Sequence, residues 1–273
     1  MNPLDILKRI PKTNCGECGY SACLAFAANV AKSGEDPQKC PYIDLDGLDI
    51  QSLGNTNLDN LSEERDLELI RHLKSKVQDL DFSKIAPRLG AVLSPDGEDA
   101  IIFSYLAQEI FMSKSQLLLN GKNPEDHRDQ ILLYNFVHSA GGSRPTGDWL
   151  GLESLPNTIS KVKTLATYCE DRLAQLFTSR PAKDILTYCK MLDGKPVLES
   201  SATAAAVIPV LPMVPQQFLF WDEEPEDGFE AKVKILFDAH VLDYLDVESL
   251  VFSAERLADR LMQLASFPPD RAK

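Results

Sequence analysis

Three cysteines lie within nine positions of one short stretch, NCGECGYSACLAFA, residues 14–27. Cys15, Cys18 and Cys23 are followed by Cys40 in DPQKCPY, which gives the spacing C-x2-C-x4-C-x16-C. Thiolates bind soft metal ions and iron–sulfur clusters, and four thiolates complete either kind of site. In a chain without a secretory signal, such clustering indicates metal or redox chemistry rather than a disulfide framework.

Three interpretations of this spacing compete. A [4Fe-4S] cluster takes two or three thiolates from one compact loop and the last from a distance, which this spacing fits. A zinc site also uses four cysteines, but usually as two C-x2-C knuckles, and the chain has one. The third interpretation is four ordinary buried thiols, but bare thiols packed so densely beside glycine turns would oxidise readily. The spacing therefore favours a [4Fe-4S] cluster, with zinc as the alternative.

The elements around the cysteines must bring the fourth thiolate back to the first three. Gly16 and Gly19 free the backbone to bend and to point amide N–H groups at sulfur. A helix is expected to begin near Tyr20, with Cys23 in its first turn. Its apolar face continues along Phe26, Ala27 and Val30. The segment KSGEDPQKC then ends the helix and returns the chain to Cys40.

The segment NCGECGYSACLAFAANVAKSGEDPQKCPY resembles a small iron–sulfur module. This module occurs at the N-terminus of the large subunit of the corrinoid iron–sulfur protein, and a similar one occurs in an iron–sulfur component of the Rnf electron-transport complex. The resemblance covers about residues 3 to 45 and includes the glycines, the FA after the third cysteine and the final CP. It implies one low-potential [4Fe-4S] cluster on Cys15, Cys18, Cys23 and Cys40.

The remainder of the chain, roughly residues 63 to 270, resembles a domain of unknown function that is fused to this module in anaerobic bacteria. The segments PTGDWLGLESLPN and FLFWDEEPEDGFEAKVKILFD carry this resemblance. The barrel and cobalamin-binding domains of the corrinoid iron–sulfur protein are not recognisable in the sequence, so methyl transfer is not implied. We therefore expect a cluster-binding module at 1–47, a linker at 48–62 and a second domain at 63–273.

A second candidate site follows an apolar helix in the larger domain. His138 precedes SAGGSRPTGDW, a glycine-rich loop that contains Arg144 and Trp149. The imidazole could ligate cobalt or another metal, the guanidinium could bind an anion, and the indole could stack on a flat ligand such as a corrinoid. The alternative is a histidine that ends a helix, a solvated arginine and a core tryptophan.

Two further cysteines, Cys169 and Cys189, stand alone in helical patterns. They are most simply small buried apolar side chains. Should they lie close together, they could form a redox pair or serve as soft metal ligands.

Composition and charge exclude several classes of protein. The 273 residues are 44% hydrophobic and 25% charged, as expected of a globular protein with a substantial core. A formal net charge of -13 disfavours binding to nucleic acid, which needs a basic surface. The sequence contains no uninterrupted stretch of about 20 apolar residues, so no membrane span is expected. The N-terminus has no apolar run of the signal-peptide kind, so we expect a cytoplasmic protein.

Periodicity predicts an α+β architecture. A helix is expected after Ser62, and short strands follow from about residue 89 on either side of the turn SPDGED. Helices are expected at 125–139, 157–178 and 181–191, then a hairpin formed by QQFLFWD and FEAKVKILF. Alternation in the second hairpin strand places five residues inward: Phe229, Ala231, Val233, Ile235 and Phe237. A helix capped by Asp246 closes the chain. Hairpins followed by runs of helices indicate an antiparallel sheet.

The sequence leads to two functional hypotheses. In the first, the protein transfers one electron from a [4Fe-4S] cluster to a redox partner protein or to a corrinoid (cobalamin) bound at the second domain. In the second, it is a noncatalytic binding or redox-sensing protein whose cluster is structural. No glycine-rich phosphate loop and no recognisable catalytic triad support another activity. The sequence does not establish catalysis.

Overall fold

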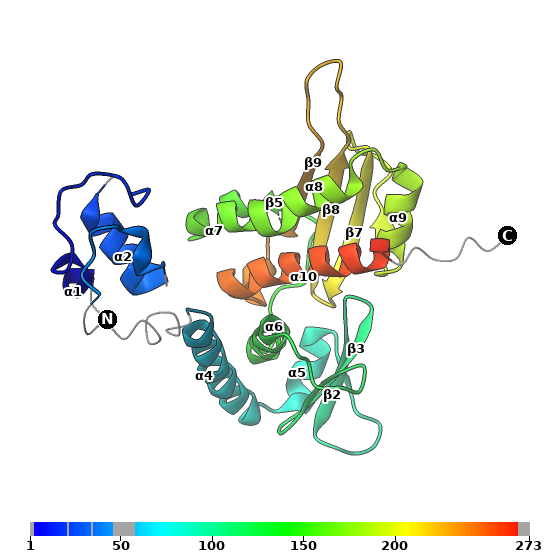
Figure 1. The fold of residues 1–273 in the computed structure, drawn as a ribbon. Coiled ribbons are helices and arrows are strands. Elements are labelled where there is room, and N and C mark those ends of the chain that lie inside the picture. Colours follow the sequence, from blue (N-terminus) through cyan, green and yellow to red (C-terminus); the bar gives the residue numbers. More distant parts are fainter. Residues whose placement is uncertain (1–2, 21, 34, 46–57, 267–273) are drawn as a thin grey trace. The chain divides into compact units, whose positions relative to one another are not determined.

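The computed structural model describes residues 3–20, 22–33, 35–45 and 58–266 (Figure 1). The chain divides into two compact units, residues 1–68 and 69–273, and helix α4 (Leu58–Gln78) crosses the division. Most of the linker predicted at 48–62 falls on residues 46–57, which lie outside the described residues. No helix in the described part of the chain is both long and apolar enough to cross a lipid bilayer.

The first unit is small and helical. It contains α1 (Pro3–Leu7), α2 (Cys23–Ser33) and the short 3-10 helix η1 (Pro37–Lys39). The second helix begins at Cys23 rather than near Tyr20, because the side chain of Asn14 accepts a hydrogen bond from the Cys23 amide and so caps the helix there (2.8 Å). The apolar side chains of α1 and α2 form a separate small core.

The second unit contains two antiparallel sheets. The first has strand order β1-β2-β3-β4, with bounds Val92–Leu93, Ala100–Tyr105, Gln108–Ser113 and Leu117–Leu119. Figure 1 shows helices α5 (Phe82–Leu89) and α6 (His127–His138) beside this sheet. The strands predicted from residue 89 onward are thus confirmed.

The second sheet has strand order β5-β9-β8-β7-β6. The bounds are Trp149–Gly151, Lys232–Asp238, Val214–Trp221, Ala204–Leu211 and Lys195–Pro196. Every second residue of β8 is buried, which is the pattern of a sheet with one face on the core. Together with the helical first unit, the two antiparallel sheets confirm the predicted α+β class.

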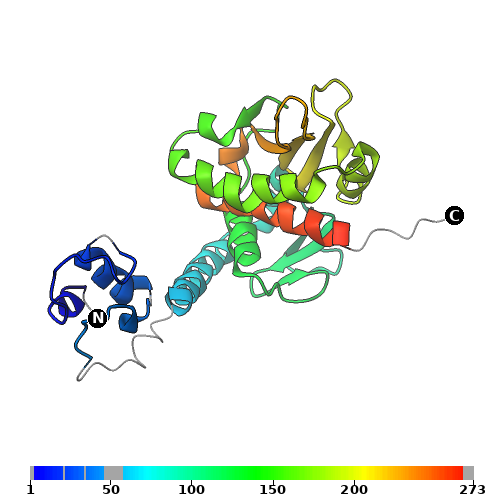
Figure 2. The same cartoon turned by 45° about the horizontal axis from the view of Figure 1, so that its top comes forward.

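Helices pack on the second sheet. They are α7 (Ile159–Leu165), the π-helical turn η3 (Ala166–Glu170), α8 (Asp171–Phe177), α9 (Ala182–Lys190) and α10 (Val247–Ser266). Figures 1 and 2 both show α10 running alongside α7 and α8. The 3-10 turns η2 (Leu152–Ser154) and η4 (Val241–Asp243) complete the connections. Asp246 caps α10, as predicted, by accepting the Ser249 N–H at 2.7 Å.

Several local predictions were wrong. The helix expected after Ser62 begins at Leu58, and α5 was not predicted because Pro87 interrupts its pattern. Phe229 does not face the core: it lies before β9, pairs with Glu224 across an isolated bridge, and is exposed. The alternating pattern that predicted an inward Phe229 begins three residues before the pairing of β8 with β9. At Phe229 the acidic hairpin turn still separates the two strands.

The two-residue turn between β2 and β3 has an unusual backbone. Leu106 and Ala107 have φ of 49° and 57°, the left-handed values of a type I′ turn, which normally selects Asn and Gly. A bulky residue in this region is a genuine outlier. Burial of the Leu106 side chain and a hydrogen bond from its N–H to the Val210 carbonyl (3.0 Å) hold the turn in place.

Replacing Ala107 with glycine should therefore stabilise the protein. Ala107 is exposed, so the change removes left-handed strain and little packing. After allowing for the greater flexibility of glycine in the unfolded chain, we expect the free energy of unfolding to rise by about 0.5–1 kcal/mol. Urea unfolding of the wild type and the A107G variant measures this difference. A destabilised A107G variant would contradict the assignment of strain to this turn.

Candidate metal centre

The four predicted cysteine ligands all lie on the first unit, at different depths. Cys15 is exposed, Cys18 is half-buried, and Cys23 and Cys40 are buried. The two buried cysteines share one apolar cluster whose other members are Ile6, Ile10, Phe26, Ala27 and Val30. Cys18 packs against the same cluster. The helical excursion between Cys23 and Cys40 thus returns the chain to a common apolar wall, as its composition predicted.

Asn14 connects the cysteine loop to the start of α2. The backbone N–H of Asn14 donates to the Cys23 Sγ at 3.3 Å, and the side-chain oxygen of Asn14 accepts the backbone N–H of Cys23 at 2.8 Å. Asn14 makes this reciprocal contact with a left-handed backbone, φ of 52°, which asparagine tolerates better than most residues. Cys23 is the first residue of α2, so its sulfur lies at the N-terminus of a helix.

The glycines of the loop have the conformations that their positions suggested. Gly16 and Gly19 have φ of 78° and 85°, and the Gly19 N–H donates to the Gly16 carbonyl at 2.9 Å. A side chain at either position would be strained by the backbone. Cys15 consequently lies just before one tight turn, and Cys18 lies within it.

A polar cluster fixes the segment that leads into Cys40. The Tyr20 hydroxyl donates to Glu35 at 2.6 Å, and the Lys39 ammonium lies 2.9 Å from the same carboxylate. Asp36 caps η1 by accepting the Gln38 N–H at 2.9 Å. These contacts connect the end of the cysteine loop with the residue next to Cys40. Hydrogen bonds from Tyr20 and Lys39 lower the pKa of Glu35 from its ordinary value of 4.5 to about 2.

The lowered pKa of Glu35 predicts acid sensitivity of this unit. Because the folded state favours the carboxylate, its contribution to stability is present above about pH 4.5 and is lost as the pH falls toward about 2. In the E35Q variant this part of the pH dependence should disappear. Amide hydrogen exchange of α2 in the full chain measures it, with the protein kept free of metal so that acid loss of a cluster does not contribute. An unchanged profile in E35Q would contradict the prediction.

The four sulfurs do not form a ready-made ligand set. Among the described residues, no group of three or more His, Cys, Asp or Glu side chains is arranged to hold a metal ion. Cys15 is exposed and Cys18 is half-buried on the glycine loop, whereas Cys23 and Cys40 are buried in the apolar cluster. The donor chemistry nevertheless fits an iron–sulfur group: four thiols, an amide N–H directed at sulfur, and an apolar wall.

The second predicted group, His138, Arg144 and Trp149, lies on the larger unit. His138 is the exposed last residue of α6, Arg144 is exposed on the following loop, and Trp149 is half-buried in β5. No interaction joins these three side chains in the described part of the chain. The structure thus places them on consecutive segments of the larger unit.

The loop that carries Arg144 is held by two aspartates. Asp238 accepts the N–H groups of Thr146 and Gly147 at 2.8 and 2.7 Å, and Asp243 accepts the Ser143 N–H at 2.9 Å. Backbone contacts to carboxylates thereby fix the positions of Arg144 and Trp149.

Cys169 and Cys189 are both fully buried in the core of the larger unit. Burial raises the pKa of Cys189 to about 12 and that of Cys169 well above its ordinary value. The Cys169 thiol lies 3.2 Å from the Ala254 carbonyl, to which it donates. Thiols held protonated in this way are inert, so both cysteines have the packing role predicted for them.

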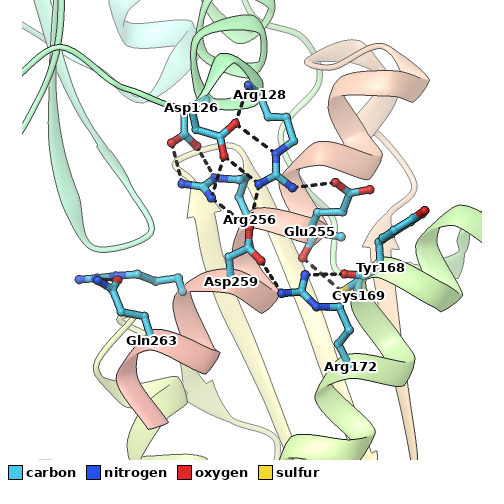
Figure 3. Close-up of polar contacts among 12 residues, drawn as sticks. Asp126, Arg128, Tyr168, Cys169, Arg172, Glu255, Arg256, Asp259 and Gln263 are labelled. Atoms are coloured by element: carbon cyan, nitrogen blue, oxygen red, sulfur yellow. Dashed lines mark hydrogen bonds and ion pairs between the residues drawn. The ribbon is translucent and has the colours of Figure 1, made fainter. Parts of the chain in front are cut away.

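A network of ion pairs in the larger unit was not predicted from the sequence (Figure 3). Arg256 of α10 donates from Nε and Nη2 to both oxygens of Asp129 on α6, each at 2.8 Å. The buried Tyr105 hydroxyl donates to the same carboxylate at 2.7 Å. Burial, together with Asp129, raises the pKa of Tyr105 well above its ordinary value.

Asp259 is the second centre of this network. Its carboxylate accepts from Arg128, Arg172 and Arg256 at 3.0, 2.8 and 3.0 Å. Arg128 also contacts Glu255 at 3.0 Å. The sequence signal for this centre was the i, i+3 pair of Arg256 and Asp259 on one helix. The contacts between different helices join residues more than 80 positions apart along the chain, so no local pattern reveals them.

Comparison with known proteins supports the prediction for the first unit. The family model described as "Putative Fe-S cluster" matches residues 10–42. The corrinoid/iron-sulfur protein large subunit of Moorella thermoacetica is 52% identical over 40 residues, which are 15% of this chain and 9% of that protein. The acetyl-CoA decarbonylase/synthase complex subunit gamma of Archaeoglobus fulgidus is 29% identical over 101 residues, 37% of this chain and 17% of that subunit. The predicted resemblance to the corrinoid iron–sulfur protein is confirmed.

The acetyl-CoA decarbonylase/synthase complex subunit gamma 2 of Methanosarcina thermophila is 45% identical over 40 residues, which are 15% of this chain and 8% of that subunit. The matches to these three relatives thus span less than a fifth of each relative's length. No solved structure matches the chain. A second family model matches residues 81–260, most of the larger unit. By this match the chain belongs to the family described as "Domain of unknown function (DUF3786)".

Proposed function

We propose that residues 1–47 form a module that binds one [4Fe-4S] cluster through Cys15, Cys18, Cys23 and Cys40, and that residues 63–273 form a domain that serves its redox partner. The observation that carries this proposal is the shared apolar wall of Cys23 and Cys40, joined by Asn14 to the loop of the other two cysteines. The match of the Fe-S family model to residues 10–42 supports it.

Binding of the cluster requires a local change in the first unit. Cys15 is exposed on a turn with two left-handed glycines, so the loop must close toward the buried cysteines. Metal binding of this kind is coupled to folding, and the free energy of ligation stabilises the closed loop. Asn14 limits the movement, because it already joins the loop to α2.

A bound [4Fe-4S] cluster supplies one-electron reduction and oxidation. The residues of the chain set the conditions for that chemistry. The Asn14 N–H directs a dipole at the Cys23 sulfur, and the apolar side chains of α1 and α2 exclude water from the buried pair. Hydrogen bonds to sulfur and exclusion of solvent are the two properties through which a protein tunes such a reduction potential.

A single cluster exchanges one electron, so a second redox centre must act as donor or acceptor. The names of the relatives associate this module with a corrinoid protein and with subunits of a larger complex. We propose a corrinoid as the partner, bound or docked at the larger domain. His138, Arg144 and Trp149 are the residues proposed to contact it, on the loop that Asp238 and Asp243 hold in place.

The test begins with protein purified without oxygen. Four-cysteine [4Fe-4S] ligation predicts brown protein with about four irons per chain and a paramagnetic resonance signal on reduction. The reduced protein is then titrated with cob(II)alamin and followed by absorption. A spectral change that is weakened in the variants H138A and R144Q supports the corrinoid proposal, with H72A as the control, since His72 is an exposed histidine on α4. A reducible cluster without any response to cob(II)alamin would reject the corrinoid but leave electron transfer standing.

The alternative of a structural or redox-sensing cluster predicts a different result. In that case cluster removal unfolds the first unit and no reversible couple is found. Colourless oxygen-free protein with zinc as its metal would reject both forms of the proposal.

A further inference from the structure

A cavity of about 350 Å³ opens beside the ion-pair network of the larger unit. Three of its lining residues have largely apolar side chains: Tyr105, Leu106 and Leu119. Its polar lining comes from two sides: Gln108 at the start of β3, and a stripe on α10 that consists of Arg256, Asp259, Arg260 and Gln263. This volume lies at the lower end of the range of about 300–1,000 Å³ that is typical of small-molecule sites.

Arg260 is the unusual member of this lining. Its Nε is buried and has no hydrogen-bond partner, and it forms no ion pair with any residue that the structure describes. Its Nη1 donates to the Gln263 side chain, which orients the guanidinium. Burial without an acceptor leaves this charged group incompletely satisfied. Because Nε itself is shielded from solvent, the donors that the guanidinium offers to the cavity are those of Nη2, which can bind a carboxylate or a phosphate.

The neighbouring charged side chains form their ion pairs with residues other than Arg260. Asp259, the one carboxylate in the cavity lining, already accepts from three other arginines at 3.0, 2.8 and 3.0 Å. Arg256 is directed away to Asp129 by two hydrogen bonds of 2.8 Å. The cationic group left for a ligand is therefore Arg260. Because the carboxylates of the network offset the positive charge nearby, recognition depends on short directional hydrogen bonds and not on a long-range field.

The rim of the cavity carries the strained β2–β3 turn. Leu106, with φ of 49°, lines the cavity directly, and so does Gln108, the residue next to Ala107. Left-handed backbone at non-glycine residues costs free energy and persists where the surrounding structure enforces it, commonly at ligand sites. The hydrogen bond from Leu106 to Val210 fixes the turn, and hence the position of Gln108.

We propose that this cavity is a binding site for a small organic anion, whose carboxylate or phosphate group pairs with Nη2 of Arg260. The amide of Gln108 contacts the polar part of the ligand, and Tyr105, Leu106 and Leu119 contact its carbon skeleton. The site is separate from the cluster module and does not depend on the function proposed for it.

The test is a calorimetric titration of the full chain with succinate, glycerol 3-phosphate and inorganic phosphate. We expect one of the two organic anions to bind more tightly than inorganic phosphate, and the preferred one identifies the head group. The R260Q variant removes the charged donor and should weaken binding by about 10-fold to 100-fold. Affinity should change little with ionic strength, because the contact is short-range.

Two further variants keep the test decisive if R260Q alters the fold. Q108E leaves Arg260 in place but adds a negative charge at the rim, so it should weaken anion binding as well. R180Q, which changes an arginine outside the cavity lining, should bind as the wild type does. Circular dichroism and thermal unfolding check that each variant is folded. The proposal is overturned if none of the three probes binds, if inorganic phosphate binds as tightly as both organic anions, or if Q108E and a folded R260Q bind as the wild type does.

Discussion

The C40S variant is expected to lose the cluster, with iron content and visible absorbance more than about 10-fold below those of the wild type after anaerobic purification. Even changes around the ligands of a metal site lower affinity about 10-fold to 100-fold, and removal of a ligand should exceed that. Cys40 is buried in the apolar cluster beside Cys23, so neither water nor another side chain can easily replace its sulfur.

Cys189 provides the matched control for this variant. It is also a buried free cysteine, but it lies in the larger unit, where burial raises its pKa to about 12. The C189A variant should retain iron, absorbance and resonance signal. A C40S protein that retains a full [4Fe-4S] spectrum would show that Cys40 is not a ligand. Equal loss in C40S and C189A would point to general destabilisation.

The R256M variant should lower the free energy of unfolding of the larger unit by about 3–5 kcal/mol, the usual cost of breaking a buried ion pair from one side. Arg256 gives two hydrogen bonds of 2.8 Å to Asp129, whose side chain is 3% exposed. Without the guanidinium, this carboxylate would remain buried with the Tyr105 hydroxyl as its hydrogen-bond donor from β2. Urea unfolding followed by circular dichroism measures the loss.

A double-mutant cycle with D129N separates the ion pair from simple loss of packing. Because D129N removes the charge that R256M leaves unpaired, the double variant should be more stable than the sum of the two single changes predicts. R180Q, outside the network, should unfold as the wild type does. Additive effects of R256M and D129N would contradict the view that the Arg256–Asp129 pair is coupled.

The amino-acid sequence by itself determined the features that depend on neighbours along the chain. The spacing of the four cysteines, the glycine turn between the first two and the cap at Asp246 are local patterns, and the structure shows the turn and the cap. Alternation identified Val233, Ile235 and Phe237 as inward residues, and all three are buried. The α+β class followed from the order of these elements. Such signals can be read from sequence because steric and hydrogen-bonding preferences act within a few residues.

Only the tertiary structure decided the features that depend on residues far apart in the sequence. The pairing of Arg256 with Asp129 spans 127 residues, and the cavity at Arg260 joins β3 to the end of α10. The same holds within the first unit, where Asn14 meets Cys23 and Glu35 meets Tyr20 across a folded loop. Each of these contacts involves a common residue type without a distinctive spacing. Their energies depend on burial and on a partner brought near by packing, and a linear pattern records neither.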